Sequence, residues 1–140
     1  MKYILITMAL ISTLWSTELV GFSDDYEASL KIAQKQNKDL YVLITSVNCR
    51  WCIKFEKTTL QDKEILKMLK EKYVLVHADR DMDDLPSWMN SKRVPKHYFV
   101  TAEGKEIFSF LGYWDSLDFR SFLGDVEKER KEKVKEGKLH

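Results

Sequence analysis

The sequence has almost no net charge and no long apolar run, and these two absences narrow the range of functions. Its 140 residues contain 23 lysines and arginines against 22 aspartates and glutamates. This balance argues against nucleic acid or another acidic polymer as the main partner. The apolar run at the N-terminus, residues 3–11, is too short for a secure transmembrane span. No internal repeat is present, and the length suits one domain with a sizeable core.

The first residues have the pattern of a targeting segment. Lys2 precedes the apolar run Tyr3–Ile11, which resembles the front of a secretory signal, although no small-x-small cleavage triplet stands out after it. We therefore expect a signal peptide or an N-terminal anchor over residues 1–22, and a periplasmic or otherwise exported protein. A buried first strand is the alternative interpretation of the same run.

The rest of the chain alternates between helical and strand patterns. Helices are predicted to begin at Asp24 (capped by Ser23), at Ile53, after Asp62, at Leu85 and after a Ser116 cap, and strands are predicted over 40–45, 73–78, 98–100 and 106–111. This order predicts an α/β fold, with a mixed central sheet flanked by helices. Residues 127–140 are mostly charged and are predicted to form a solvated helical tail that frays.

The only two cysteines lie close together, in the sequence Cys49-Arg50-Trp51-Cys52. A strand pattern ends before them and a helical pattern follows, so Cys49 should lie against the free N–H groups of a helix start. Those groups and the helix dipole stabilise a thiolate, and the neighbouring Arg50 adds a positive charge that favours it further. A thiolate attacks disulfides, which makes Cys52 the resolving thiol. A structural disulfide is the alternative, but so small a loop would constrain the unfolded chain little.

Three features in order make the chain resemble the thioredoxin superfamily, and most of all its exported thioredoxin-like branch. The first is the cysteine pair at a strand-to-helix junction. The second is Val94-Pro95 just before a strand, and the third is the hairpin connection 103–106 followed by Gly112-Tyr113. The resemblance covers about residues 24–126, and it predicts a thioredoxin-like domain over residues 23–126 and a thioredoxin-like fold.

The resemblance also implies roles for residues outside the cysteine pair. Pro95 would follow a cis peptide bond and lie opposite the cysteines, where the backbone of Val94 could pair with an extended substrate. Trp51 would contact substrate peptides or, alternatively, pack on a neighbouring loop. The chain departs from the family at Leu43, where a buried acid is common, and at Asn48, which replaces a tryptophan.

Two further sets of residues have plainer interpretations. His77 and His97 lack ligand spacing, so a metal site with the cysteines is not predicted. Lys54 and Glu56 could move protons near Cys52, but the pattern favours solvent-facing helix positions for both.

Together these features predict a thiol–disulfide oxidoreductase that acts on protein thiols and disulfides without a metal or organic cofactor. The resemblance favours the reducing direction, with a membrane-bound thiol reductase as electron donor. An oxidase or isomerase on the same fold, and a binding or chaperone-like module with idle cysteines, remain the alternatives.

Overall fold

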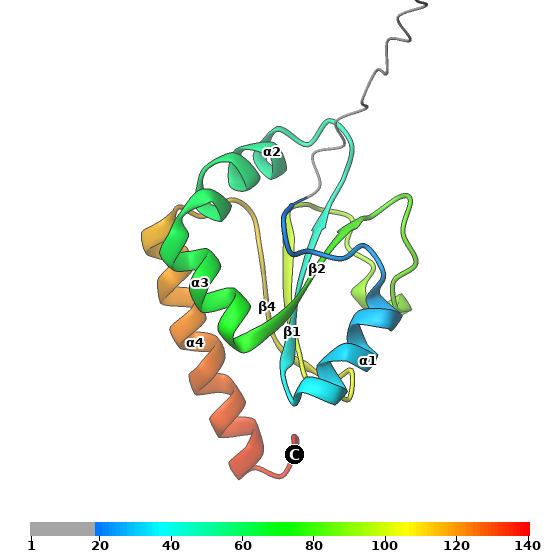
Figure 1. The fold of residues 1–140 in the computed structure, drawn as a ribbon, viewed down its shortest axis with the longest axis vertical. Coiled ribbons are helices and arrows are strands. Elements are labelled where there is room, and N and C mark those ends of the chain that lie inside the picture. Colours follow the sequence, from blue (N-terminus) through cyan, green and yellow to red (C-terminus); the bar gives the residue numbers. More distant parts are fainter. Residues whose placement is uncertain (1–18) are drawn as a thin grey trace, which may run out of the picture.

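The computed structural model describes residues 19–140, which form a four-stranded sheet in the order β2-β1-β3-β4 (Figure 1). β1 (Asp39–Thr45) pairs in parallel with β2 (Tyr73–Asp79) and antiparallel with β3 (Lys96–Val100). β3 also pairs antiparallel with β4 (Glu106–Leu111). The predicted mixed sheet is therefore confirmed, and each predicted strand matches its observed counterpart within two residues at either end.

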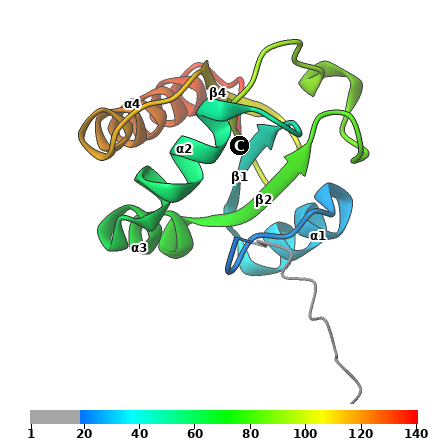
Figure 2. The same ribbon diagram turned by 90° about the horizontal axis from the view of Figure 1, so that it is seen from above.

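Helices cover both faces of this sheet, and each face has its own apolar core. α1 (Tyr26–Gln36) covers one face, and α2 (Arg50–Lys57), α3 (Lys63–Lys72) and α4 (Ser116–Lys135) cover the other (Figure 2). Single 3₁₀ turns lie at Thr59–Gln61 and Ser87–Met89. The α/β fold class predicted from the sequence is confirmed.

Three helix starts differ from the predictions. α1 begins at Tyr26, because Asp25 accepts the N–H of Ala28 at 2.8 Å and takes the capping position predicted for Ser23. α2 begins inside the cysteine motif, with Cys49 as its N-cap, and not at Ile53. Asp115 caps α4, and Ser116 is that helix's first residue. In each case the residue immediately before the observed start supplies a side-chain acceptor for the free N–H groups.

In place of the helix predicted from Leu85, the structure has a single 3₁₀ turn, Ser87–Met89. Pro86 stands at its N-cap and Asn90, with an extended backbone, ends it.

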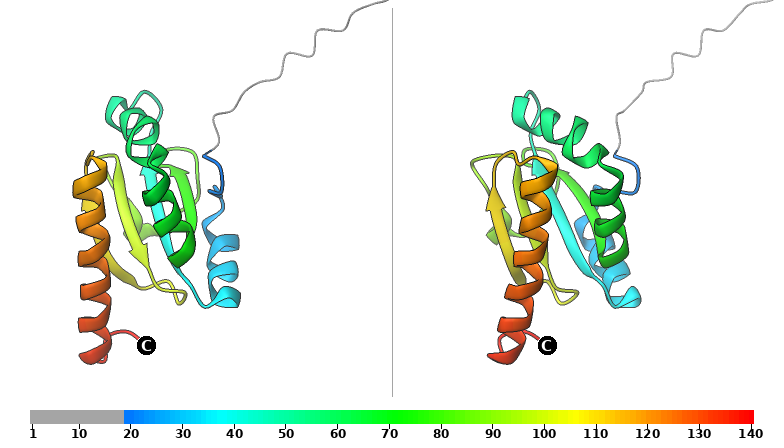
Figure 3. Two further views of the ribbon diagram at one scale, coloured as in Figure 1. Left: turned by 60° about the vertical axis from the view of Figure 1, so that its left-hand side comes forward. Right: turned by 90° about the vertical axis from the view of Figure 1, so that its left-hand side faces the viewer.

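At the C-terminus the structure is more ordered than a fraying tail. α4 continues to Lys135, and the chain turns back beyond it (Figure 3). Leu139 is only 4% exposed because it packs into the core. Charged residues of this segment bind strand ends: Lys133 donates to the carbonyl of Ile107, and Arg130 pairs with Asp39. The charges predicted to be solvated therefore partly anchor the helix.

The segment before α1 is joined to β2. Ser23 donates to the carbonyl of Leu75 at 3.0 Å and its own carbonyl accepts the N–H of His77 at 2.8 Å. Phe22 contacts Tyr41 edge to face, at 6.2 Å between ring centroids. Most of the predicted targeting segment, residues 1–18, lies outside the described residues. Within residues 19–140, no helix has the length and apolar character needed to cross a bilayer.

A polar chain is buried between the sheet and the α2–α4 layer. His97 is fully buried; its Nε2–H donates to the carbonyl of Gly112 at 2.9 Å, and its Nδ1 accepts from the hydroxyl of Tyr41 at 2.8 Å. The carbonyl can only accept, and this fixes the tautomer. Burial lowers the pKa of His97 to about 3 and raises that of Tyr41 well above its usual value.

We expect the neutral form of His97 to make stability pH-dependent. The unfolded histidine takes up a proton near pH 6.5, but the folded one does so only near pH 3. Its contribution is therefore fully present above pH 6.5 and is lost as the pH falls from there towards 3, at about 1.4 kcal/mol per pH unit. Between pH 7 and 5, urea unfolding should show a loss about 2 kcal/mol larger for the wild type than for His97→Gln. Equal losses in the two proteins would contradict this assignment.

Candidate active site

Cys49 lies between the end of the central strand, β1, and the start of α2. β1 ends at Thr45, and Asn48 adopts the left-handed backbone conformation, with φ 63°, that turns the chain towards the helix. Asparagine tolerates this conformation better than most residues. Cys49 is then the N-cap of α2, and its Sγ accepts the N–H of Cys52 at 3.2 Å. The sulfur therefore occupies the electropositive end of the helix.

Cys49 and Cys52 form a disulfide, with their Cα atoms 5.2 Å apart. The two sulfurs differ in accessibility, because Cys49 is partly exposed and Cys52 is 2% exposed. Phe55, one turn further along α2, is fully buried and anchors this face of the helix in the core. The arrangement presents one sulfur of the pair outward and keeps the other inside.

An open groove of about 270 Å³ adjoins the cysteine motif, lined by Trp51, Val94, Pro95, Gly112 and Tyr113. The Val94–Pro95 peptide bond is cis. The N–H of Gly112 donates to the carbonyl of Pro95 at 2.8 Å, directly beyond the β3–β4 pairing. Three residues that the sequence analysis placed beside the cysteines line this one groove: Trp51, Val94 and Pro95. The fold brings them together although the cysteine motif and the proline are far apart in the chain.

Trp51 packs on a neighbouring loop, which was one of the two alternatives, and its contact with substrate peptides stays a prediction. Its side chain packs on Tyr113, with ring centroids 5.8 Å apart, and the residue remains 45% exposed. Tyr113 was not predicted as a site residue. The register of the β3–β4 hairpin is what places it there. Because Lys96 pairs with Leu111, the residues just beyond β4 must lie beside Pro95.

Two cations lie on these aromatic rings. The guanidinium carbon of Arg50 is 5.1 Å from the ring centroid of Trp51, and Lys54 Nζ is 5.2 Å from the same ring and 4.5 Å from that of Tyr113. Lys54 is exposed, as the pattern predicted. Its position on the groove side, however, could not be read from the pattern.

Glu56 differs from its predicted solvent-facing position. Its side chain is about one-fifth exposed, and its Oε1 lies 3.3 Å from Nε2 of His77 on β2. The same nitrogen lies 2.9 Å from the hydroxyl of Thr45 at the end of β1. Leu43, where the family commonly has an acid, is fully buried. Glu56 of α2 is therefore a partly buried carboxylate close to the sheet, whereas the central strand has none at position 43.

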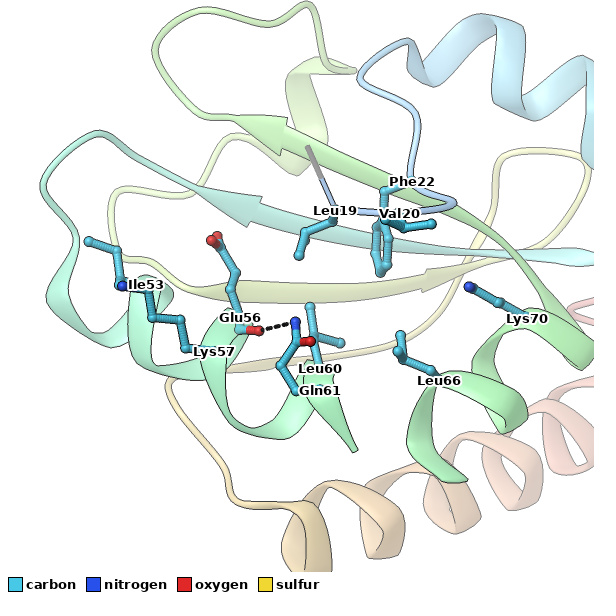
Figure 4. A pocket seen from close by; sticks show the side chains of 10 residues that line it. All are labelled: Leu19, Val20, Phe22, Ile53, Glu56, Lys57, Leu60, Gln61, Leu66 and Lys70. Atoms are coloured by element: carbon cyan, nitrogen blue, oxygen red, sulfur yellow. Dashed lines mark hydrogen bonds between the residues drawn. The ribbon is translucent and has the colours of Figure 1, made fainter. Parts of the chain in front are cut away.

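A second, larger hollow of about 430 Å³ lies on another side of α2 (Figure 4). Apolar side chains of the N-terminal segment, α2, the first 3₁₀ turn and α3 line it, together with the polar side chains of Glu56, Lys57, Gln61 and Lys70. It shares no lining residue with the groove beside the cysteines. Among residues 19–140, histidine, cysteine and acidic side chains form no cluster of three or more that could hold a metal ion.

A family model described as the thioredoxin-like domain matches residues 26–127. The chain belongs to this family. The match spans both the cysteine motif and the Val94–Pro95 loop. The thioredoxin-like fold predicted from the sequence is thereby confirmed.

Known proteins resemble the chain over different lengths. Human spermatogenesis-associated protein 20 is 35% identical over 49 residues, which are 35% of this chain and only 6% of that protein. The solved structure of the DsbH oxidoreductase covers 84% of this chain and 92% of its own, with a TM-score of 0.59 and 19% identity. A thioredoxin from Thermus thermophilus covers 74% and 82%, with a TM-score of 0.60 and 20% identity. At these identities the two structures support the fold alone.

The geometry predicts unequal thiol reactivity after reduction. Cys49 should be alkylated before Cys52, by about ten-fold or more at pH 7, because it is more accessible and caps a helix beside Arg50. Mass spectrometry of the reduced protein after brief iodoacetamide treatment would measure this difference. The single-thiol variants Cys49→Ser and Cys52→Ser give the rate of each thiol alone. Equal rates in these two variants would contradict the prediction.

Proposed function

We propose that this protein is a thiol–disulfide oxidoreductase that exchanges its Cys49–Cys52 disulfide with protein substrates, and that it acts as a reductase. The observation that carries the proposal is the asymmetry of the pair: one sulfur caps α2 at the surface and the other is buried. The adjoining groove supports it, because a substrate segment needs room beside the reactive sulfur. Membership of the thioredoxin-like family supports the same chemistry.

The exchange proceeds in two steps from the reduced protein. The Cys49 thiolate attacks one sulfur of a substrate disulfide, a mixed disulfide forms, and the other substrate sulfur leaves as a thiolate that then takes up a proton. Cys52 then loses its proton and attacks Cys49 Sγ, which restores the protein disulfide and releases the second substrate thiol. Two electrons pass to the substrate, and no metal or organic cofactor takes part.

The groove supplies the substrate-binding surface in this proposal. Val94, at the end of the loop before β3, offers its backbone to an extended segment, while Pro95 and the ring of Trp51 form apolar walls. Strand-like pairing gives affinity without demanding a particular sequence. Arg50, next to Cys49, favours the thiolate through its charge.

The reducing direction requires a source of electrons. For an exported protein we propose a membrane-bound thiol reductase as donor, which would attack the Cys49–Cys52 disulfide in the reverse of the steps above. Export itself rests on the N-terminal sequence pattern, Lys2 followed by the apolar run Tyr3–Ile11.

Insulin reduction tests whether the cysteines are active. The purified protein should accelerate the precipitation of insulin chains by dithiothreitol, and Cys49→Ser should abolish the acceleration. A Cys49→Ser protein as fast as the wild type would instead favour a binding module with idle cysteines.

Trapping tests the order of attack. Cys52→Ser leaves Cys49 able to attack but removes the thiol that resolves the mixed disulfide. Covalent complexes with protein partners should therefore accumulate in cells that express Cys52→Ser, and a reductant should cleave them into the separate proteins. Cys49→Ser is the matched control, which should give none. Complexes with Cys49→Ser alone would show that the two roles are reversed.

A reduction potential separates the reductase from an oxidase or isomerase on the same fold. Reductants of this fold have reduction potentials of about −270 mV, and strong oxidants of about −120 mV. Equilibration of the Cys49–Cys52 pair with glutathione buffers should give a value in the lower part of this range. A value near the oxidants would reverse the proposed direction but retain the exchange chemistry.

A further inference from the structure

We propose that the groove beside the cysteines selects substrate segments that carry carboxylates next to the reactive cysteine. This inference rests on the proposed function, because it names the class of substrate for the same site. It holds for either redox direction, since it concerns binding of the segment and not the flow of electrons. The observation behind it is the pair of cations that the groove's own aromatic rings hold in place.

Lys54 and Arg50 are fixed on the rim by contact with the rings. Lys54 Nζ lies over both Trp51 and Tyr113, the two aromatic residues that line the groove. Arg50 lies over the same tryptophan. A cation over an aromatic face is held by the ring's quadrupole and loses part of its side-chain freedom before any ligand arrives. A carboxylate that binds these cations therefore pays less ordering entropy than at a free lysine.

No acidic side chain neutralises these two cations within residues 19–140. The ion pairs of the described chain include neither Arg50 nor Lys54. The two carboxylates closest in sequence to the groove residues have other partners: Glu56 faces His77, and Asp115 accepts N–H groups at the start of α4. The rim thus keeps an uncompensated positive charge beside Cys49.

Two further cations lie in the chain segment before the groove residue Val94. Lys92 and Arg93 are exposed and directly precede Val94, which lines the groove. The acidic loop after β2 approaches this segment through Arg80, which donates to the carbonyl of Lys92 and also binds Asp81. The other carboxylates of this loop, Asp83 and Asp84, make no ion pair within residues 19–140, so the proposed selection rests on Arg50 and Lys54.

A basic substrate segment would therefore meet like charges at Arg50 and Lys54, and an acidic one would meet opposite charges there. Complementary charge raises the rate of encounter and discriminates between partners more than it raises affinity. The effect should also weaken with salt, because these groups are exposed. Both consequences can be measured on model substrates.

The test uses disulfide-linked dimers of a short cysteine peptide whose flanking residues are Asp, Asn or Lys. The full-length protein, reduced beforehand, is mixed with each dimer, and oxidation of its Cys49–Cys52 dithiol is followed in a single turnover. The protein S–S bond forms, the peptide S–S bond breaks, and the two thiol protons pass to the two released peptides. The rate with each peptide dimer is divided by the rate at which dithiothreitol, a neutral thiol, reduces the same dimer. This normalisation removes the intrinsic reactivity of each peptide.

We expect the normalised rate to be about five-fold higher for the Asp peptide than for the Lys peptide, and the ratio to approach one in molar salt. Lys54→Glu should lower or reverse the preference. Lys31→Glu is the matched control, because it makes the same charge change at an exposed position of α1, on the other face of the sheet. It should leave the preference and the rates unchanged. Circular dichroism checks that both variants fold.

The outcomes distinguish a failure of the charge selection from a failure of the proposed function. Exchange at equal normalised rates for all three peptides would overturn the charge selection and leave the proposed function intact. Absence of exchange with every peptide would overturn the proposed function and this inference with it. If Lys54→Glu does not fold, the peptide series and its salt dependence in the wild type still decide the question.

Discussion

The whole arrangement depends on β1, a strand that is hydrogen-bonded along both edges and covered on both faces. Its residues from Leu40 to Ile44 are completely buried, between β2 on one side and β3 on the other. Two apolar cores meet on this strand, one under α1 and one under the α2–α4 layer. Because the strand cannot shift without disturbing both cores, the position at which it releases the chain towards Cys49 is also fixed.

A second restraint joins the sheet to the groove. His97, near the start of β3, binds Tyr41 on β1 and the carbonyl of Gly112 beyond β4. Gly112 in turn donates to Pro95. The floor of the groove is therefore tied to the central strand through a buried, fully partnered polar chain, and such chains resist partial rearrangement. Rigid support of this kind keeps a site's walls at a fixed distance from its reactive atom.

The sequence predicted the parts of this molecule that depend on local pattern. Strand positions, the fold class and the cysteine motif at a strand-to-helix junction all follow from apolar periodicity and from motif order. Helix starts were less accurate, because any neighbouring Asp or Cys side chain can take the cap, as Asp25, Cys49 and Asp115 do. The contacts of Tyr113 and Glu56 were missed, since hairpin register and the adjacent strand decide them and residue type does not.

The burial of Cys52 has a kinetic consequence. In the proposed exchange this thiol can reach only a sulfur of the same protein molecule, that of Cys49, because Cys52 is 2% exposed. An attack between groups held together in one molecule proceeds as if the attacker were present at a very high concentration. The lifetime of a bound substrate is then set by the fold and not by the thiols of the surrounding medium. The rate of substrate release would then be the same in compartments where small thiols are abundant and in those where they are scarce.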